Sequence, residues 1–135
     1  MLKAQIISKG FIAAAAMNIS GVLIFSRFFT NSVITESDPV IMSNFGLLMI
    51  VIWGLAYLSV SEDYNKVKWI VGVFAIEKFI YGFVWTKWLL NNDISLVYAK
   101  DTMAGIFYTI YGINDWIFFF FFAYVFFGLA IAEKE

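Results

Sequence analysis

Residues 103–132 read MAGIFYTIYGINDWIFFFFFAYVFFGLAIA, and this stretch decides the class of fold. It is long enough to cross a bilayer as an α-helix, because about 20 apolar residues span ~30 Å of hydrocarbon. A transmembrane β-strand would alternate apolar and polar side chains, whereas residues 117–122 read IFFFFF. Asp115 is the one charged residue in the stretch. The sequence therefore predicts a membrane-spanning helix with a carboxyl group in its interior.

The rest of the chain has the same character. It has 135 residues, of which 62% are hydrophobic and 14% charged, whereas soluble domains are about one-quarter charged. A soluble globule of this size has too small an interior to bury so much apolar surface. We therefore expect an all-α integral membrane protein that forms one transmembrane domain over residues 1–135.

Windows without charge, or with few charges, predict three further spans. No charged residue lies between Lys9 and Arg27 or between Asp38 and Glu62. The four predicted spans are residues 8–29, 40–61, 69–90 and 103–132, joined by short polar segments. This pattern predicts a four-helix bundle with antiparallel, up-down topology.

Capping residues suggest where two of these helices begin. Asp38 is a candidate N-cap for the second span, with Pro39 at its first helical position. Asp101 or Thr102 is the candidate cap of the fourth span. At the N-terminus, the small residues 13–16 precede the apolar residues 22–25, the reverse of the order in a secretory signal. We therefore expect a retained first helix.

Basic residues near the helix ends predict the orientation. The side that holds both termini carries Lys3, Lys9, Lys66, Lys68 and Lys134, and the other side carries Arg27, Lys87 and Lys100. The positive-inside rule then places both termini in the cytoplasm.

Three polar positions, far apart in the sequence, are predicted at one depth. Asn18 and Glu77 each lie nine residues from the inner charged end of their spans, which is ~13 Å at ~1.5 Å per residue. Asp115 lies about twelve residues from the outer end of its span, which leaves ~12 Å to the inner side. Trp53 and Tyr57 of the second span pass through the same zone. Because charges in hydrocarbon are costly, we expect the polar groups to face the bundle interior.

The chemistry of this layer predicts an ion pair between Lys78 and Asp115. One Lys cannot neutralise both Asp115 and Glu77, so the second carboxylate carries a proton or holds a cation or a cationic ligand. Tyr81 and Tyr111 lie four residues from Glu77 and Asp115, on the same helix faces. We expect Asn18 and Asn114 to donate amide hydrogens to a carboxylate. The candidate ion- or ligand-binding set is therefore Glu77, Lys78, Asp115, Asn114, Asn18, Tyr81 and Tyr111. The alternative is that these groups only fix helix packing, since polar side chains also join membrane helices.

Several classes of function are excluded or disfavoured. The chain has no Cys and no His, which removes thiolate chemistry, the usual haem ligand and the commonest zinc ligand. We expect no cofactor, no metal site and no catalytic residue. The net charge of −1 gives no basic surface for nucleic acid.

Spans two to four resemble a loose group of small bacterial membrane proteins. The segments that carry the resemblance are residues 53–57 (WGLAY), Glu77-Lys78 and residues 114–116 (NDW). They resemble the four-helix, DoxX-like membrane proteins of largely unassigned function. In that group the span-three Lys often follows Gly, whereas here Glu77 precedes it, and prolines often follow the span-four Asp, whereas here the residues are aromatic. The resemblance implies a bacterial or archaeal cytoplasmic membrane and makes an accessory subunit of a quinone-linked oxidoreductase conceivable.

Two functions follow from these patterns, and we rank the first slightly ahead. The chain is an accessory or structural subunit that packs against a larger membrane complex through its Phe-rich face. Alternatively, it binds or transports an ion, a proton or a small amphiphile at the polar layer, in a homo-oligomer because four short helices enclose little volume. An enzyme is the least favoured class, since no nucleophile–base or metal-ligand spacing occurs. The expected partners are the lipid bilayer and either other membrane subunits or further copies of the chain.

Overall fold

The computed structural model describes residues 1–135 and contains helices and turns but no strand, which confirms the all-α prediction. The elements are α1 (Ala4–Phe25), α2 (Ser32–Ser37), α3 (Asn44–Val60), the 3-10 helix η1 (Tyr64–Lys66), α4 (Lys68–Asn91), α5 (Ile94–Lys100) and α6 (Thr102–Ala132).

Three helices, α1, α4 and α6, are long and apolar enough to cross a membrane. Helix α3 is equally apolar but has only 17 residues. Of the four predicted spans, three therefore coincide with helices of sufficient length. These helices make the chain an integral membrane protein by length and composition.

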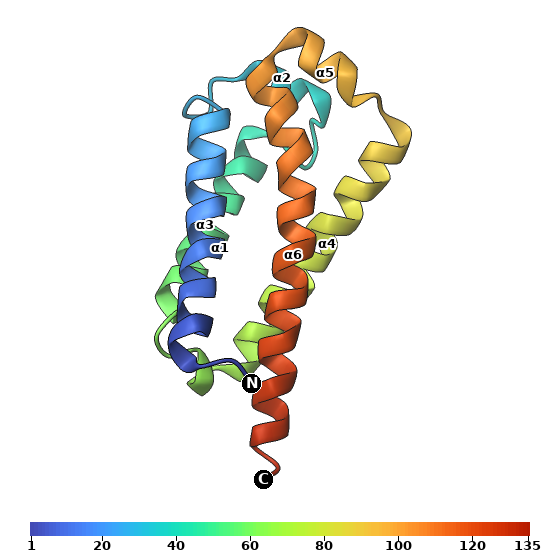
Figure 1. Cartoon of the computed structure of the whole chain (residues 1–135). Helices are drawn as coiled ribbons and strands as arrows, with labels where there is room; N and C mark the ends of the chain where they lie inside the picture. The colour runs from blue at the N-terminus through green and yellow to red at the C-terminus, as the bar shows by residue number, and fades with distance from the viewer.

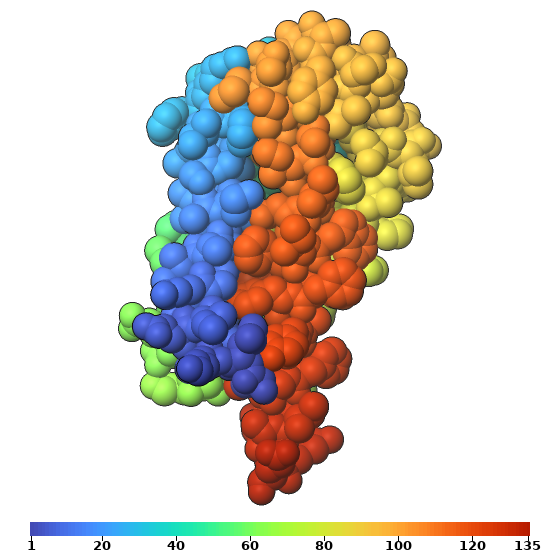
Figure 2. All heavy atoms as spheres, viewed as in Figure 1, coloured from blue at the N-terminus to red at the C-terminus, as the bar shows by residue number.

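The long helices lie side by side, with α6 packed on α4 and α1, and α3 packed on α1 (Figure 1). Both chain termini lie at one end, and α2 and α5 lie at the other (Figure 1). The C-terminal end of α6 extends beyond its neighbours (Figure 2). At the terminal end, Lys68 forms an ion pair with Glu133. At the other end, Arg27 pairs with Asp101. The fold therefore brings the beginning of α4 to the end of α6.

The predicted start of the second span is wrong by several residues. Helix α3 begins at Asn44, where the Ser43 side chain accepts the Gly46 N–H at 3.0 Å. Asp38 instead accepts the Ile41 N–H at 3.3 Å and closes a turn before the helix. That turn crosses the helix start so closely that a Cβ at Gly46 would lie 2.0 Å from the Ile41 carbonyl oxygen. The helix therefore cannot continue back to Pro39.

The first span also ends earlier than predicted, at Phe25 instead of residue 29. Arg27, Phe28 and Phe29 have φ of 49°, 55° and 67°, the left-handed region that non-glycine residues rarely adopt. The side chain of Ser26 accepts the Phe29 N–H at 2.9 Å within this reversal.

The predicted cap of α6 is present, since Asp101 Oδ2 accepts the Ala104 N–H at 2.9 Å. The polar connections between spans contain α2, η1 and α5 instead of loops alone.

The apolar core is divided into two clusters. One, towards the termini, is built around Phe11, Phe74 and Phe122. The other, towards α2 and α5, is built around Trp88 and Tyr108, whose rings stack with centroids 4.5 Å apart. Along α1, α4 and α6, the buried polar residues fall between the segments that contribute to these two clusters. The polar residues thus occupy a layer across the middle of the bundle.

Candidate functional site: a buried charged centre

Lys78 on α4 is the hub of the polar layer. Its Nζ lies 2.7 Å from Asp115 Oδ1 on α6 and donates a second hydrogen bond to Asn18 Oδ1 on α1 at 2.9 Å. The side chain of Lys78 is 1% exposed and that of Asp115 is 9% exposed. Because hydrocarbon offers no other partner for an ammonium group, the ion pair and the hydrogen bond to Asn18 together fix the relative positions of three helices.

Asn18 connects the hub to the shorter helix α3. Its Nδ2 donates to the Ile50 carbonyl at 3.0 Å. The two helices approach closely at Gly54, where a Cβ would meet the Asn18 Cβ at 3.0 Å and the Ala15 carbonyl oxygen at 3.2 Å. A small residue at this position lets a buried amide reach the neighbouring backbone, as is common between membrane helices.

Glu77, the second carboxylate, has a different set of partners. It accepts a hydrogen bond from the Tyr57 hydroxyl of α3. No Lys or Arg lies within salt-bridge distance of it, although it is only 7% exposed. The Lys78 ammonium lies 5.3 Å from the centroid of the Tyr57 ring, so this ring contacts both halves of the centre.

The charges of the centre do not balance. One ammonium group faces two carboxyl groups, and the ammonium pairs with Asp115. A net negative charge buried this deeply is costly. The centre therefore favours one additional proton, and Glu77 is the carboxyl group that forms no ion pair.

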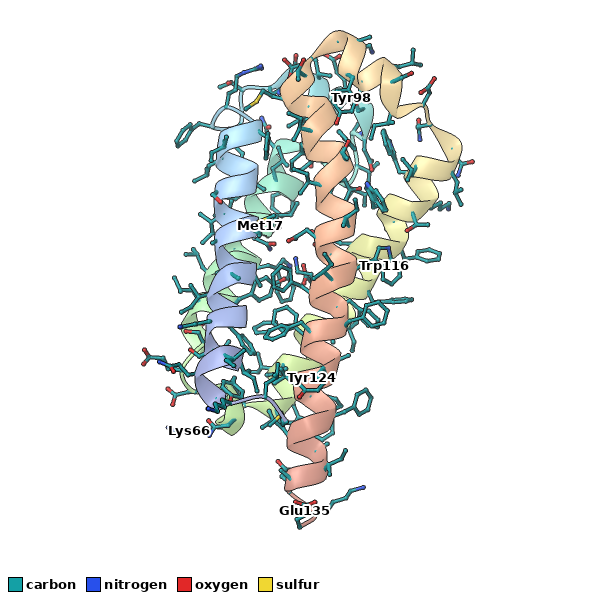
Figure 3. The ribbon with its side chains drawn as sticks, viewed as in Figure 1. Met17, Lys66, Tyr98, Trp116, Tyr124 and Glu135 are labelled. Carbon is teal, nitrogen blue, oxygen red and sulfur yellow. The ribbon has the colours of Figure 1, made fainter.

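The structure joins three of the seven residues that the sequence nominates. Asn18 and Asp115 both contact Lys78, and the predicted Lys78–Asp115 ion pair is present. Figure 3 shows Met17 and Trp116, the chain neighbours of Asn18 and Asp115, at similar heights along the bundle. The depth argument from helix rise thus agrees with the structure.

The remaining nominated residues are more loosely connected. The amide of Asn114 reaches Asp115 Oδ1 only at 3.5 Å. The Tyr111 hydroxyl is buried without a hydrogen-bond partner. Tyr81 is half-buried, and its hydroxyl forms no hydrogen bond. The expectation that Asn18 donates to a carboxylate is wrong, because its carbonyl oxygen accepts from Lys78 and its amide donates to Ile50.

Tyr57 belongs to the centre but is absent from the nominated set. Its depth along the second span places it in the polar layer, which was the available signal. Depth alone does not say which face of α3 it occupies, and only the packing of α3 against α1 turns Tyr57 towards Glu77. A tyrosine on an apolar helix is more often an ordinary packing residue, so depth alone does not select Tyr57.

No family model, no curated protein and no solved structure matches this chain. The resemblance to DoxX-like proteins therefore stays a prediction. The chemistry of the site follows from its own geometry, in which two carboxyl groups and one ammonium group are buried on adjacent helices. Such an arrangement can hold and exchange a proton, and it can also fix the packing of the bundle.

Proposed function

We propose that the chain is a small proton-linked transport protein, in which Glu77 binds and releases one proton at the centre of a four-helix bundle. The observation that carries this proposal is the surplus carboxyl group, buried beside an ion pair that already uses the only cation of the centre. Ionisable groups inside membrane helices most often serve ion or proton pathways.

The close packing of the centre favours a proton over a metal cation. Glu77 is held by the Tyr57 hydroxyl, and Asp115 is held by Lys78. No group of three or more acidic, His or Cys side chains is arranged to ligate a metal ion. A hydrated cation requires more oxygen ligands than one free carboxyl group provides, whereas a proton requires only that group.

The proposal includes four antiparallel crossings with both termini in the cytoplasm. Helix α3 is ~26 Å long at ~1.5 Å per residue, slightly short of a ~30 Å hydrocarbon layer. A short span is accommodated by local thinning of the bilayer. Two buried contacts support the crossing of α3, because Ile50 and Tyr57 pair with polar groups on long, apolar helices. The basic residues Lys66 and Lys68 at the terminal end support the orientation.

An acid-step experiment in proteoliposomes tests the proposal. With a pH-sensitive dye inside the vesicles and the membrane potential clamped, we expect faster internal acidification than in protein-free vesicles. Glu77→Gln should return the rate to that of protein-free vesicles. Glu36→Gln, which removes an exposed carboxyl group outside the long helices, should leave the rate unchanged. A Glu77→Gln rate equal to that of the unmodified chain would contradict the proposal.

An accessory-subunit role is the second candidate, because the face of α4 and α6 carries a long apolar groove. The groove has a volume of about 490 Å³ and is lined by residues such as Gly72, Ala75, Ala123, Phe119 and Phe126. A lining that combines small residues with aromatic rings suits the side of another membrane helix.

Purification from native membranes in mild detergent tests this second role. A partner present at one copy per chain supports it, provided that Ala123→Trp, which fills the groove, releases the partner. A matched Ala13→Trp variant, on the exposed face of α1, should keep it. Recovery of the chain alone or as a homo-oligomer would contradict the accessory role.

A further inference from the structure

A small pocket lies between α1 and α6, next to the charged centre. Its volume is about 50 Å³. Three polar residues line it, Asn18, Tyr111 and Asn114, and the rest of its wall is largely apolar, including Ile50 and Ile110. Two of the three polar residues adjoin the ion pair, since Asn18 bonds to Lys78 and Asn114 precedes Asp115.

The Tyr111 hydroxyl at this pocket has no hydrogen-bond partner. Tyr111 is 8% exposed, and its hydroxyl is the only buried side-chain polar atom in the chain without a partner. A buried hydroxyl without a hydrogen bond is destabilising. The Asn114 carbonyl oxygen also accepts no hydrogen bond from the protein, since its amide nitrogen makes the contact to Asp115. Two residues that line the pocket thus each have a polar atom without a protein partner, a donor on Tyr111 and an acceptor on Asn114.

Gly21 on α1 supports the view that the pocket is kept open. A Cβ at Gly21 would meet no atom within 4 Å, so no close packing explains the glycine. By contrast, a Cβ at Gly54 would lie 2.8 Å from Ile19. Glycine inside a helix is destabilising relative to alanine. Since Gly21 lines the pocket, its absent side chain leaves that wall unfilled.

We propose that this pocket binds the neutral hydroxyl or carbonyl head of an apolar molecule that enters from the bilayer between α1 and α6. The Tyr111 hydroxyl donates to the head, and the Asn114 carbonyl accepts from it when it is a hydroxyl. The volume admits a head of a few atoms, so the apolar body remains against the surrounding side chains and the lipid. An anionic head is disfavoured because Asp115 lies next to Asn114. The inference rests on the proposed transport function and names the class of molecule that is transported.

Photolabelling in lipid nanodiscs tests the pocket, with a long-chain alcohol that carries a photoreactive diazirine near its hydroxyl. Mass spectrometry should locate the label on pocket-lining residues of α1 and α6. An excess of unlabelled alcohol should compete, and a diazirine alkane of equal length without the hydroxyl should label these residues several-fold less. Tyr111→Phe, which removes one oxygen and keeps the ring, should lower labelling about threefold to tenfold, the range that one hydrogen bond in a membrane protein supports.

A second variant tests the shape of the pocket. Gly21→Val adds bulk into open space and should abolish the labelling without disturbing the fold. Ser20→Val adds similar bulk on the exposed face one residue earlier and should leave the labelling unchanged. Equal labelling by the alcohol and the alkane, or labelling that Tyr111→Phe does not reduce, overturns the inference and leaves water as the occupant. The readout does not require proton exchange, so the pocket and the proton-binding role of Glu77 can fail separately.

Discussion

Two ion pairs of similar geometry tie α6 to its neighbours: Arg27, just after α1, pairs with Asp101 at the end of the bundle, and Lys78 of α4 pairs with Asp115 at its centre. At the end, Arg27 lies 2.7 Å from Asp101, and Asn31 donates to the same carboxylate at 2.8 Å. At the centre, Lys78 lies 2.7 Å from Asp115 and donates to Asn18 at 2.9 Å. Each site therefore combines one cation, one Asp and one Asn.

Their surroundings differ. The Arg27 side chain is 51% exposed, whereas that of Lys78 is 1% exposed. The end pair is balanced in charge and its carboxylate also caps α6, whereas the central pair has Glu77 beside it. Exposed ion pairs contribute little to stability, while removal of one partner from a buried pair is severe. The two pairs therefore have different roles despite their equal distances. The end pair includes the carboxylate that caps the start of α6, whereas the central pair lies in a site with one surplus carboxyl group.

The largest expected effect comes from removing the central cation. Lys78→Met leaves the buried Asp115 carboxylate without its ammonium partner, and we expect the free energy of unfolding to fall by about 3–5 kcal/mol. SDS titration of the protein in detergent micelles measures this change. The matched Arg27→Met variant should lose about 1 kcal/mol or less.

A double variant sharpens the same comparison. Adding Asp115→Asn to Lys78→Met removes the stranded charge and should recover much of the lost stability. Equal costs for Lys78→Met and Arg27→Met would show that the two ion pairs are equivalent, and the distinction between them would be lost.

The next effect concerns the hydroxyl that holds the surplus carboxyl group. Tyr57→Phe keeps the ring but removes the only hydrogen-bond donor to Glu77, and we expect a loss of about 1–2 kcal/mol. The control is Tyr124→Phe, whose hydroxyl accepts the Leu2 N–H in an exposed position. Thermal unfolding followed by near-UV circular dichroism compares the two, and an unchanged Tyr57→Phe protein would remove Tyr57 from the centre.

A smaller effect is expected at the end pair. Asp101→Ala removes both the partner of Arg27 and the N-cap of α6, and should cost about 1 kcal/mol. Asp101→Asn keeps a capping side chain and should cost less. SDS titration of both variants measures the difference. If Asp101→Ala cost as much as Lys78→Met, the end pair would be as important as the centre.

The smallest effect is a pH dependence confined to the end pair. The Arg27 guanidinium, the Ala104 N–H and the Asn31 amide lower the pKa of Asp101 from 3.8 to about 2. A lowered pKa stabilises the folded state above the unfolded value, so the contribution is complete above pH ~4 and is lost as the pH falls towards 2. The stability difference between the unmodified chain and Asp101→Asn should therefore shrink over this window. A difference that stays constant would contradict the assignment.

The sequence predicts the three long helices α1, α4 and α6 and the common level of Asn18, Lys78 and Asp115 along the bundle, because windows with few charges and helix rise determine both. It therefore anticipates the contact of Asn18, Lys78 and Asp115. It does not predict the start of α3. Asp38 and Ser43 are both possible N-caps, and which of them caps the helix depends on the turn that brings the Ile41 carbonyl against Gly46. The sequence also does not predict that Tyr57 is the partner of Glu77, because the rotation of α3 about its axis is set by packing and not by the residues of α3 alone.

The central claim is that Glu77 carries the proton that balances the buried centre, and infrared spectroscopy in lipid nanodiscs tests it most directly. At neutral pH, the unmodified chain should show the C=O stretching band of a protonated carboxyl group that is shielded from water. The account predicts that this band disappears in Glu77→Gln and persists in Glu36→Gln. A spectrum without the band, or a band that survives in Glu77→Gln, would contradict it.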